Sequence, residues 1–285
     1  MAWSFKTFEI LPEQQFLQWG KLLEERTGIQ LAPQQKILLQ TQMSIRMREL
    51  GIEKYDEYFE HVTDGARGLV EWQVLVDRLV VKETSFFRHR PSLEFVRQLL
   101  QNRISRKELS ESFEVWSVGC ATGEEPYSLA MVANDCFELA AMRPYYGVTA
   151  TDVSLPALAT ARKGIYTERR LALLTQDEHD RYFSPVDEYH FRIIDKLKQR
   201  ICFAQGNILN LSVMPVSKMD IIFCQNVLVY FRRWRRKEIL NQLVKRLKPG
   251  GVLVIGLGEA TDWQCNDVQR IANEEIQAYV RCVAT

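Results

Sequence analysis

The sequence contains no pair of cysteines in the C-x-x-C spacing that zinc sites and thiol–disulfide enzymes use. Its six cysteines are scattered along the chain, at Cys120, Cys136, Cys202, Cys224, Cys265 and Cys282. Scattered thiols argue against a zinc centre or a disulfide framework, and they indicate reduced cysteines in the cytosol.

Long apolar runs and an excess of one charge are also missing. No run approaches membrane-spanning length, and the start, MAWSFKTFEI, lacks the apolar segment of a signal peptide. We therefore expect a soluble cytoplasmic protein without membrane insertion. The formal net charge of +1 gives no overall attraction to nucleic acid. The 285 residues, 46% of them hydrophobic, are enough for a large domain and a smaller one.

The first part of the chain, residues 1–80, has the pattern of a small helical domain. One face of the segment 34–50 carries apolar residues at helical spacing: Leu39, Met43, Met47 and Leu50. Gly51 follows as a stop signal, and further apolar helical patterns cover 54–62 and 69–81. Because no alternating run of β-branched residues interrupts this region, we expect an all-α domain.

After a linker at 81–110, strand and helix patterns alternate through a domain at 111–285. Strands are expected at 113–118, 146–152, 220–226 and 252–258, and helices at 125–140, 155–164 and 235–251. This order predicts a Rossmann-like, doubly wound α/β sheet with its ligand crevice at the carboxyl ends of the strands. At about 163–205 the alternation breaks, and strand-like runs at 190–195 and 200–207 predict a small antiparallel β insertion.

The segment SVGCATGEEPYS joins the first expected strand to a helix. Gly119 and Gly123 let the backbone turn sharply and approach a ligand at the helix N-terminus. The spacing differs from G-x-G-x-x-G, and Glu124 and Glu125 would repel a pyrophosphate. Two carboxylates suit a cationic ligand such as S-adenosylmethionine (SAM). The alternative is a plain strand-to-helix turn with solvated acids.

Polar residues end further strands. Asp152 ends the second expected strand, where an acid can accept both ribose hydroxyls of a nucleoside. The alternative is an N-cap for the next helix, a role that Ser154 can also fill. Gly206 and Asn207 end a later strand-like run, at a common place for contact with an adenine ring.

The run DIIFCQNVLVYF combines a buried-looking strand with polar and aromatic residues. Gln225 and Asn226 at its end can hold an adenine edge or a substrate. Tyr230 and Phe231 would meet a substrate near the methyl donor, or they are simply core aromatics. We expect Cys224 to be a small buried residue and not a nucleophile, since nothing near it in sequence would lower its pKa.

The motifs ETSFFR, GCATGEEPYS, ATD, GNI, FCQNVLVYF and LKPGG occur in one particular order. In this order, and over nearly the whole chain, the sequence resembles the CheR family of chemoreceptor glutamate methyltransferases. The resemblance implies SAM as methyl donor, S-adenosylhomocysteine (SAH) as product and no metal. It also implies a monomer whose partner is the cytoplasmic domain of a methyl-accepting chemoreceptor, in a chemotaxis or type IV pilus array.

Matching positions imply roles for single residues. The implied cofactor contacts are Thr84, Arg88, Gly119, Glu125, Asp152, Asn207, Ile208, Gln225 and Asn226. The implied catalytic residues are Arg88 and Tyr230, and Glu124 remains an alternative to Glu125. The sequence departs from the family at Lys82, usually an asparagine, and at Gln225, usually an arginine. Lysine cannot accept a hydrogen bond, so Lys82 is left out of the site.

Other interpretations stay open. The segment RRWRRK at 232–237, and Arg46 with Arg48, are candidates for a receptor-facing surface or are solvated helix faces. The chain is alternatively a SAM methyltransferase acting on a small molecule or nucleic acid, or a SAM-binding regulatory module without catalysis. Against a nucleic-acid enzyme, no D/N-P-P-Y loop follows the strand at 220–226, and the charge is low.

Overall fold

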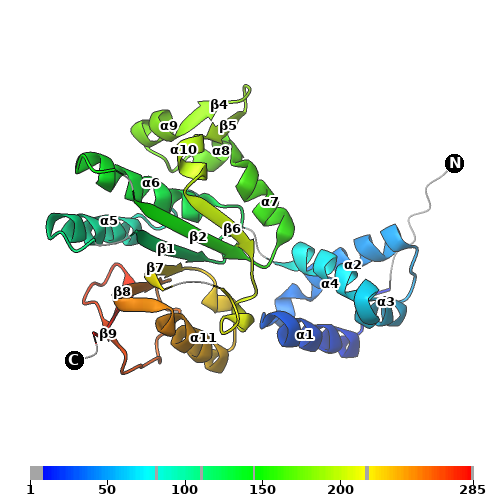
Figure 1. Ribbon diagram of the computed structural model, residues 1–285. Helices are drawn as coiled ribbons and strands as arrows, with labels where there is room; N and C mark the ends of the chain where they lie inside the picture. The colour runs from blue at the N-terminus through cyan, green and yellow to red at the C-terminus, as the bar shows by residue number, and fades with distance from the viewer. Residues whose placement is uncertain (1–8, 81–82, 110–111, 144, 216–217, 284–285) are drawn as a thin grey trace. The chain divides into compact units, whose positions relative to one another are not determined.

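The computed structural model describes residues 9–80, 83–109, 112–143, 145–215 and 218–283 (Figure 1). The chain divides into two compact units. The smaller unit comprises Met1–Val81 and Tyr230–Arg232, and the larger comprises Lys82–Val229 and Arg233–Thr285. Within the described ranges, no helix combines the length and the apolar character needed to cross a membrane.

The smaller unit is helical, as expected. Its elements are α1 (Glu13–Thr27), the 3-10 helix η1 (Pro33–Gln35), α2 (Lys36–Leu50), α3 (Tyr55–Thr63) and α4 (Gly65–Leu79). The residues Leu39, Met43 and Met47 are buried along α2, whereas Leu50 is exposed. Leu50 lies in the last turn, directly before the left-handed Gly51 that ends the helix, so the apolar face stops one turn earlier than expected.

An ion network inside the helical unit joins α2 to α4. The nearly buried Glu71 accepts hydrogen bonds from Nε and Nη2 of Arg46 and from Oη of Tyr58, at 2.7–2.8 Å. Arg46 also donates to Glu49 at 2.9 Å. Burial and the neighbouring carboxylate raise the pKa of Tyr58. Arg46 therefore serves the fold, and only Arg48 of the expected pair remains as a candidate for a receptor-facing surface.

The larger unit alternates helices and strands. Its helices are α5 (Arg90–Ser105), α6 (Glu124–Leu139), α7 (Leu155–Lys163), α8 (Glu168–Leu171), α9 (Gln176–Tyr182), α10 (Asp195–Lys198) and α11 (Arg233–Lys245), with 3-10 helices η2 (Ile208–Asn210) and η3 (Leu228–Tyr230). Its strands are β1 (Phe113–Val118), β2 (Tyr146–Asp152), β3 (Ile165–Thr167), β4 (Phe183–Pro185), β5 (His190–Ile193), β6 (Ile201–Gln205), β7 (Met219–Cys224), β8 (Leu247–Ile255), β9 (Val268–Arg270) and β10 (Gln277–Arg281).

Seven strands form one sheet in the order β6-β2-β1-β7-β8-β10-β9. Neighbours from β6 to β8 pair in parallel, and β10 pairs antiparallel with both β8 and β9. This confirms the predicted α/β class. The strand order reverses between β1 and β7, and such a switch point places ligands at the carboxyl edge of the sheet. The antiparallel pair β9–β10 was not predicted from the sequence.

A second sheet contains three antiparallel strands in the order β3-β5-β4 and confirms that a small β insertion exists. The prediction that the strand-like run at 200–207 belongs to the insertion is wrong, however. The strand β6 pairs in parallel with β2, from Val148–Ile201 to Asp152–Gln205, and so belongs to the large sheet. Short alternating strands look alike in sequence, and only the pairing partner separates them. We use "the insertion" below for residues 164–200.

The segment LKPGG also differs from the expectation. The helix predicted over 235–251 ends at Lys245, and β8 begins at Leu247. Met219 pairs with Leu247 but Ile221 pairs with Val252, so the prolyl-glycyl turn is a bulge within the strand.

The hydrophobic core of the larger unit lies between the sheet and the helices α5 and α6, which run side by side (Figure 1). It joins Leu93 and Val96 of α5 to Leu129 of α6 and to the central strands, where Val115 and Ile221 are buried. All six residues of β7 are buried, as is usual for a central parallel strand covered on both faces. This packing fixes the strand ends that carry the candidate site.

Candidate active site

The polar residues singled out in the sequence follow the carboxyl ends of β1, β2, β6 and β7. Backbone bonds hold these ends in register: the N–H groups of Gly119 and Cys120 donate to Thr151 O at 2.8 and 3.0 Å. The N–H of Gly206 donates to Asp152 O at 3.0 Å. Parallel pairing therefore brings segments that are far apart in sequence to one edge of the sheet.

The first segment is the cofactor loop, residues 119–125, between β1 and α6. Gly119 has φ of 73°, and a Cβ placed on it would lie 2.5 Å from Cγ2 of Val227. Gly123 has φ of 98° and is the N-cap residue of α6. Both glycines are therefore required by backbone conformation, and Gly119 also by the close approach of the segment after β7.

Asp152 holds the cofactor loop from the end of β2. Its Oδ2 accepts from Ala121 N at 2.8 Å, and its Oδ1 accepts from Ser154 N at 2.9 Å. Ser154 is the N-cap of α7, with its side chain accepting from Ala157 N at 3.3 Å. The capping alternative thus belongs to Ser154, and Asp152 is an acceptor whose carboxylate is fixed in orientation.

Glu125 lies in the first turn of α6, at the end of the loop, and is half-buried. Ser117 Oγ donates to Glu125 Oε1 at 2.6 Å. Burial raises the pKa of Glu125 to about 8, against the opposing effects of the Ser117 hydrogen bond and of the positive charge of Arg88. The charge of Glu259 raises the pKa of Glu125 further. A cation that binds near this carboxyl would favour its charged form.

The adjacent Glu124 has a different environment. It is 0% exposed, and it accepts from Arg170 Nη1 at 2.5 Å and from Thr122 Oγ1 at 2.7 Å. Its charge is therefore matched inside the protein. Of the two glutamates that the sequence left open, Glu125 is the better candidate for a ligand contact.

The linker segment reaches the same end of α6. Phe87 N donates to Ser128 Oγ at 3.0 Å, and Phe86 packs edge-to-face on Tyr166 and Phe183 at centroid distances of 4.9 and 5.3 Å. Both phenylalanines are buried in the core of the larger unit and anchor the segment by packing. Lys82 lies outside the described residues.

Two side chains of the linker remain available beside this anchor. Thr84 is half-buried, and Arg88 is exposed with Nη1 donating to Glu83 O at 3.1 Å. The charge of Arg88 is close enough to Glu125 to lower the pKa of that carboxyl. The structure thus brings Arg88 and Glu125, 37 positions apart in the printed sequence, to one locality.

Gln225, at the end of β7, bridges the strand to helix α5. Its Nε2 donates to Ser92 Oγ at 2.8 Å and to Ile255 O at 3.2 Å. Ser92 is fully buried and also hydrogen-bonds to His89 Nδ1 at 2.8 Å. Both amide hydrogens of Gln225 are used in this way, so a glutamine has a structural role where the family resemblance led us to expect an arginine.

The neighbouring Asn226 is exposed and has φ of 59°. Phe87 and Ala121 also have positive φ, 49° and 46°. Such backbone costs about 1–3 kcal/mol per residue and concentrates at functional sites. Here the three residues lie in the linker, the cofactor loop and the segment after β7.

The end of β6 carries the expected adenine-side pair. Asn207 caps the short helix η2 by accepting from Leu209 N at 3.0 Å, and both Asn207 and Ile208 are half-buried. This contact fixes the orientation of the Asn207 side chain.

Tyr230 and Phe231 have different environments. Phe231 is buried, which favours the core alternative for this residue. Tyr230 groups with the helical unit, where its carbonyl accepts from Gln30 N at 2.8 Å. Arg232 groups there too, with Nη2 donating to Glu24 Oε2 at 2.9 Å. Arg232 thus has an internal partner within the basic segment 232–237.

Sequence reasoning missed Glu259, which follows β8. It is 3% exposed, and its Oε2 accepts from Gly256 N at 2.8 Å. Burial raises its pKa, while the amides of Gly256, Val229 and Val227 and the charge of Arg236 oppose that rise. The available signal was an acid directly after the carboxyl end of a parallel strand, in the run GLGE.

Cys224 and Cys120 are fully buried, and burial raises the pKa of both thiols well above the ordinary value. The prediction that Cys224 is a small buried residue is confirmed. A thiol that resists ionisation is a poor nucleophile.

These groups fit a cationic nucleoside. Asp152 is an oriented hydrogen-bond acceptor, and the charge of Glu259 disfavours ionisation of Glu125. A positively charged ligand would relieve that repulsion, whereas a pyrophosphate would increase it. The sulfonium and ammonium groups of SAM meet this requirement.

Comparison with known families agrees with the geometry. Residues 82–278 match the model described as "CheR methyltransferase, SAM binding domain", and residues 14–80 match "CheR methyltransferase, all-alpha domain". The chain belongs to the CheR methyltransferase family. Its larger unit is accordingly a SAM-binding methyltransferase domain, and SAM is its cofactor.

Individual relatives of this CheR protein are similar over most of their length. The "Chemotaxis protein methyltransferase" of Escherichia coli is 32% identical over 252 residues, 87% of this chain and 85% of the relative. "Chemotaxis protein methyltransferase Cher2" of Pseudomonas putida is 32% identical over 86% of this chain and 90% of the relative. The "Chemotaxis protein methyltransferase" of Borreliella burgdorferi is 29% identical over 84% and 85%.

Proposed function

We propose that this CheR-family protein methylates glutamate side chains in the cytoplasmic domain of a methyl-accepting chemoreceptor, giving glutamyl methyl esters that adjust sensory signalling. The observation that carries the proposal is Arg88, an exposed cation of a SAM-binding domain whose charge lowers the pKa of Glu125. The names of the relatives, all chemotaxis protein methyltransferases, support the same assignment.

The chemistry asks little of the protein beyond binding and orientation. A substrate glutamate has an ordinary pKa near 4.3, so at neutral pH it is already ionised and needs no general base. When bound, SAM supplies a methyl group activated by its positive sulfur. Proximity and orientation lower a reaction barrier by about 7–11 kcal/mol when the geometry is good. The residues of the site therefore need to hold the substrate carboxylate and the methyl group in line.

Arg88 is the proposed partner of the substrate carboxylate. Removing water from a carboxylate is unfavourable unless hydrogen bonds replace the water. The planar guanidinium donates forked, charge-assisted hydrogen bonds, so it can hold the oxygen that does not attack. The hydrogen bond from Arg88 to Glu83 O uses one nitrogen, Nη1, and the side chain is exposed. We propose that Tyr230 orients the same carboxylate through its hydroxyl.

The remaining residues are proposed to hold SAM. Asp152 would accept the ribose hydroxyls, and Asn207 with Ile208 would border the adenine. Gly119 would allow close backbone approach, Glu125 would face the positive groups, and Thr84 would offer a hydroxyl from the linker. Gln225 and Asn226 would border the cofactor from the end of β7, with Gln225 oriented by its bonds to Ser92 and Ile255.

A receptor bundle rich in glutamate needs a basic docking surface. We propose two separate candidates for such a surface. One is Arg48 on α2 of the helical unit, which is exposed, and the other is the set of exposed side chains of the segment 233–237 in the larger unit. Arg46 is excluded because Glu71 and Glu49 bind its guanidinium.

The test is to incubate the protein with methyl-labelled SAM and membranes that contain chemoreceptors. Base-labile label on the receptor is the expected result, because glutamyl methyl esters hydrolyse in base. Label that is stable to base, or label on nucleic acid or a small molecule, would replace the proposal with another methyltransferase activity. SAM binding without any transfer would indicate a regulatory module.

A further inference from the structure

The insertion contacts the cofactor loop directly. Arg170 of α8 donates from Nη1 to Glu124 Oε1 at 2.5 Å and to Thr122 Oγ1 at 3.2 Å. Tyr166 of β3 donates its hydroxyl to Thr122 O at 2.8 Å. Thr122 and Glu124 both belong to the loop that ends at Glu125. Side chains of the insertion thus restrain the loop.

Space is tight around these contacts. Glu124 is 0% exposed and Thr122 is 7% exposed. A Cβ at Gly123 would lie 2.8 Å from Ala161 Cβ and 3.0 Å from Tyr166 Oη. A carboxylate buried to this degree needs its partner, because an unpaired charge in the interior is strongly unfavourable. The loop therefore has little freedom to shift while Arg170 is in place.

The same glutamate connects the insertion to the linker. Glu124 O accepts from Ser128 Oγ at 2.7 Å, and Ser128 Oγ accepts from Phe87 N at 3.0 Å. Phe86 then packs on Tyr166 with 4.9 Å between ring centroids. Arg170 is therefore bonded to a residue that also supports the backbone next to Arg88.

We propose that Arg170 is a positioning residue for the cofactor. By holding Glu124 and Thr122 it fixes the cofactor loop, and this sets the position of Glu125 without any contact between Arg170 and the cofactor. The insertion is then a structural part of the SAM site. This inference rests on the cofactor-binding part of the proposed function and is independent of the identity of the methyl acceptor.

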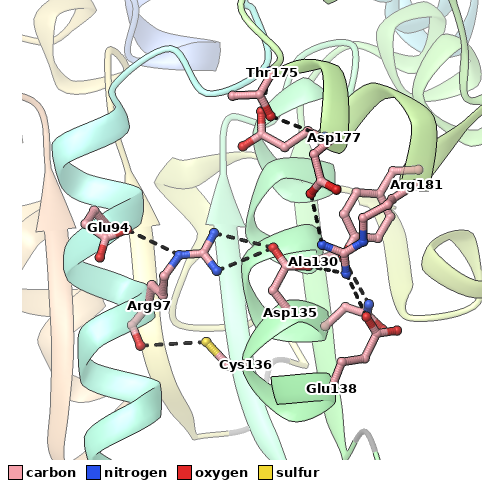
Figure 2. A network of polar contacts seen from close by, with 12 residues as sticks. Glu94, Arg97, Ala130, Asp135, Cys136, Glu138, Thr175, Asp177 and Arg181 are labelled. Carbon is pink, nitrogen blue, oxygen red and sulfur yellow. Dashed lines mark hydrogen bonds and ion pairs between the residues drawn. The ribbon is translucent and has the colours of Figure 1, made fainter. Parts of the chain in front are cut away.

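A separate set of ion pairs joins the insertion to α6. Figure 2 shows Arg181 of α9 between acidic residues of α6: it lies 2.8 Å from Asp135 and 2.7 Å from Glu138. Asp135 also pairs with Arg97 of α5 at 3.4 Å. This network lies in the last half of α6, and Glu124 is the first residue of that helix. Replacement of Arg170 should therefore loosen the loop and leave the insertion docked.

The experiment compares Arg170→Met with the wild-type protein by calorimetric titration of SAH. We expect the dissociation constant to rise about tenfold or more, equivalent to about 1.4 kcal/mol. The matched control is Arg169→Met, which changes an exposed arginine of the same helix and should bind SAH as the wild type does. Amide exchange of residues 119–125 should accelerate in Arg170→Met and not in the control.

Two further variants separate positioning from folding. Arg170→Lys keeps one charged donor and should recover part of the lost affinity. The double variant Arg170→Met with Glu124→Gln leaves no unpaired buried charge, so its thermal midpoint should return toward wild type. Its affinity for SAH should stay low, because the bond that restrains the loop is still missing. When the SAM concentration is varied, the loss should appear in KM for SAM, and the rate at saturating SAM should match that of the wild type.

Unchanged SAH affinity in folded Arg170→Met would overturn the proposal. If Arg170→Met does not fold, the double variant decides: normal SAH binding there would assign Arg170 to folding alone. Failure of receptor methylation by the wild-type protein would overturn the proposed substrate and leave these binding results in force.

Discussion

Ser117 Oγ donates a 2.6 Å hydrogen bond to Glu125 Oε1, which ties the end of β1 to the first turn of α6. This bond favours the charged carboxylate, yet burial is the larger effect and raises the pKa of Glu125 to about 8. The site in the free protein therefore retains a proton near neutral pH. A cation that binds beside Glu125 should displace that proton.

Affinity for SAM should consequently rise with pH. Between pH 6 and about 8, the raised pKa of Glu125 makes binding release up to one proton, so affinity increases by at most about tenfold per pH unit. Above about 8 the increase should stop. Titrations in buffers of different ionisation enthalpy measure the proton release. Glu125→Gln should bind more weakly and lose this dependence, and an unchanged pH slope in that variant would assign the proton to another group.

The contribution of Glu125 to the stability of the free protein should fall as pH rises, opposite to the pH dependence of SAM affinity. The pKa of Glu125 is higher in the folded state than the ordinary carboxyl value, so the folded state holds a proton that the unfolded state releases. The stabilisation that this proton gives is complete at pH values below the ordinary carboxyl pKa, and it is lost as the pH rises to about 8. Thermal midpoints of wild type and Glu125→Gln, measured from pH 5 to 8.5, should diverge in favour of the variant at high pH.

Arg88→Ala should affect catalysis more than cofactor binding. We expect methyl transfer to fall about a hundredfold, because the substrate carboxylate loses its orienting partner, while SAH affinity changes only a few fold. Arg88→Lys is the matched control. It keeps the charge but lacks the planar fork, so its activity should lie between those of the wild type and Arg88→Ala. If SAH affinity and the rate of methyl transfer fell in parallel, Arg88 would be assigned to cofactor binding and not to substrate binding.

Gly119→Ala should destabilise the larger unit by about 2–4 kcal/mol. The new Cβ would lie 2.5 Å from Val227 Cγ2 on backbone with φ of 73°. Gly250→Ala has nearly the same φ, 72°, with no atom within 4 Å, and should cost only about 1–2 kcal/mol of backbone strain. Urea unfolding gives both values. Adding Val227→Ala to Gly119→Ala should recover the steric part, and equal losses at the two glycines would contradict the clash.

Asp152→Asn should lower SAH affinity about tenfold or more, equivalent to about 1.4 kcal/mol. The amide would turn an N–H group toward the N–H of Ala121 or Ser154, both of which now donate to the carboxylate. The control Ser154→Ala removes the cap of α7, costing about 1 kcal/mol of stability while leaving affinity within about twofold. Calorimetric titration and thermal unfolding of both variants separate the two effects.

Arg46→Ala should destabilise the helical unit by roughly 3 kcal/mol, because the buried Glu71 would keep only Tyr58 as a hydrogen-bond partner among the residues that the structure describes. Arg48→Ala changes an exposed side chain and should alter stability by less than about 1 kcal/mol. Thermal unfolding compares them. If Arg48→Glu also reduces receptor methylation without changing SAH affinity, the proposed docking surface on α2 is supported, and full activity of that variant would remove it.

Local chemistry in the sequence was sufficient for much of the site. The left-handed Gly119 and Gly123 and the buried Cys224 follow from composition and spacing, because backbone freedom and apolar burial are properties of single residues. The alternation of strands and helices also predicted the parallel sheet and its functional edge. The match to the CheR family confirms the resemblance that these motifs carried.

Only the tertiary structure separated residues that look equivalent in sequence. Glu124 and Glu125 are adjacent acids, yet one pairs with Arg170 of the insertion and the other keeps a raised pKa. Likewise Arg46 is bound to Glu71, whereas Arg48 is exposed. The strand β6, which was predicted as part of the insertion, pairs with β2 in the large sheet. Partner choice depends on contacts between distant segments, and no local pattern encodes it. The sequence therefore determined which chemical groups this protein has, and the fold decided which of them are matched internally and which remain to meet a ligand.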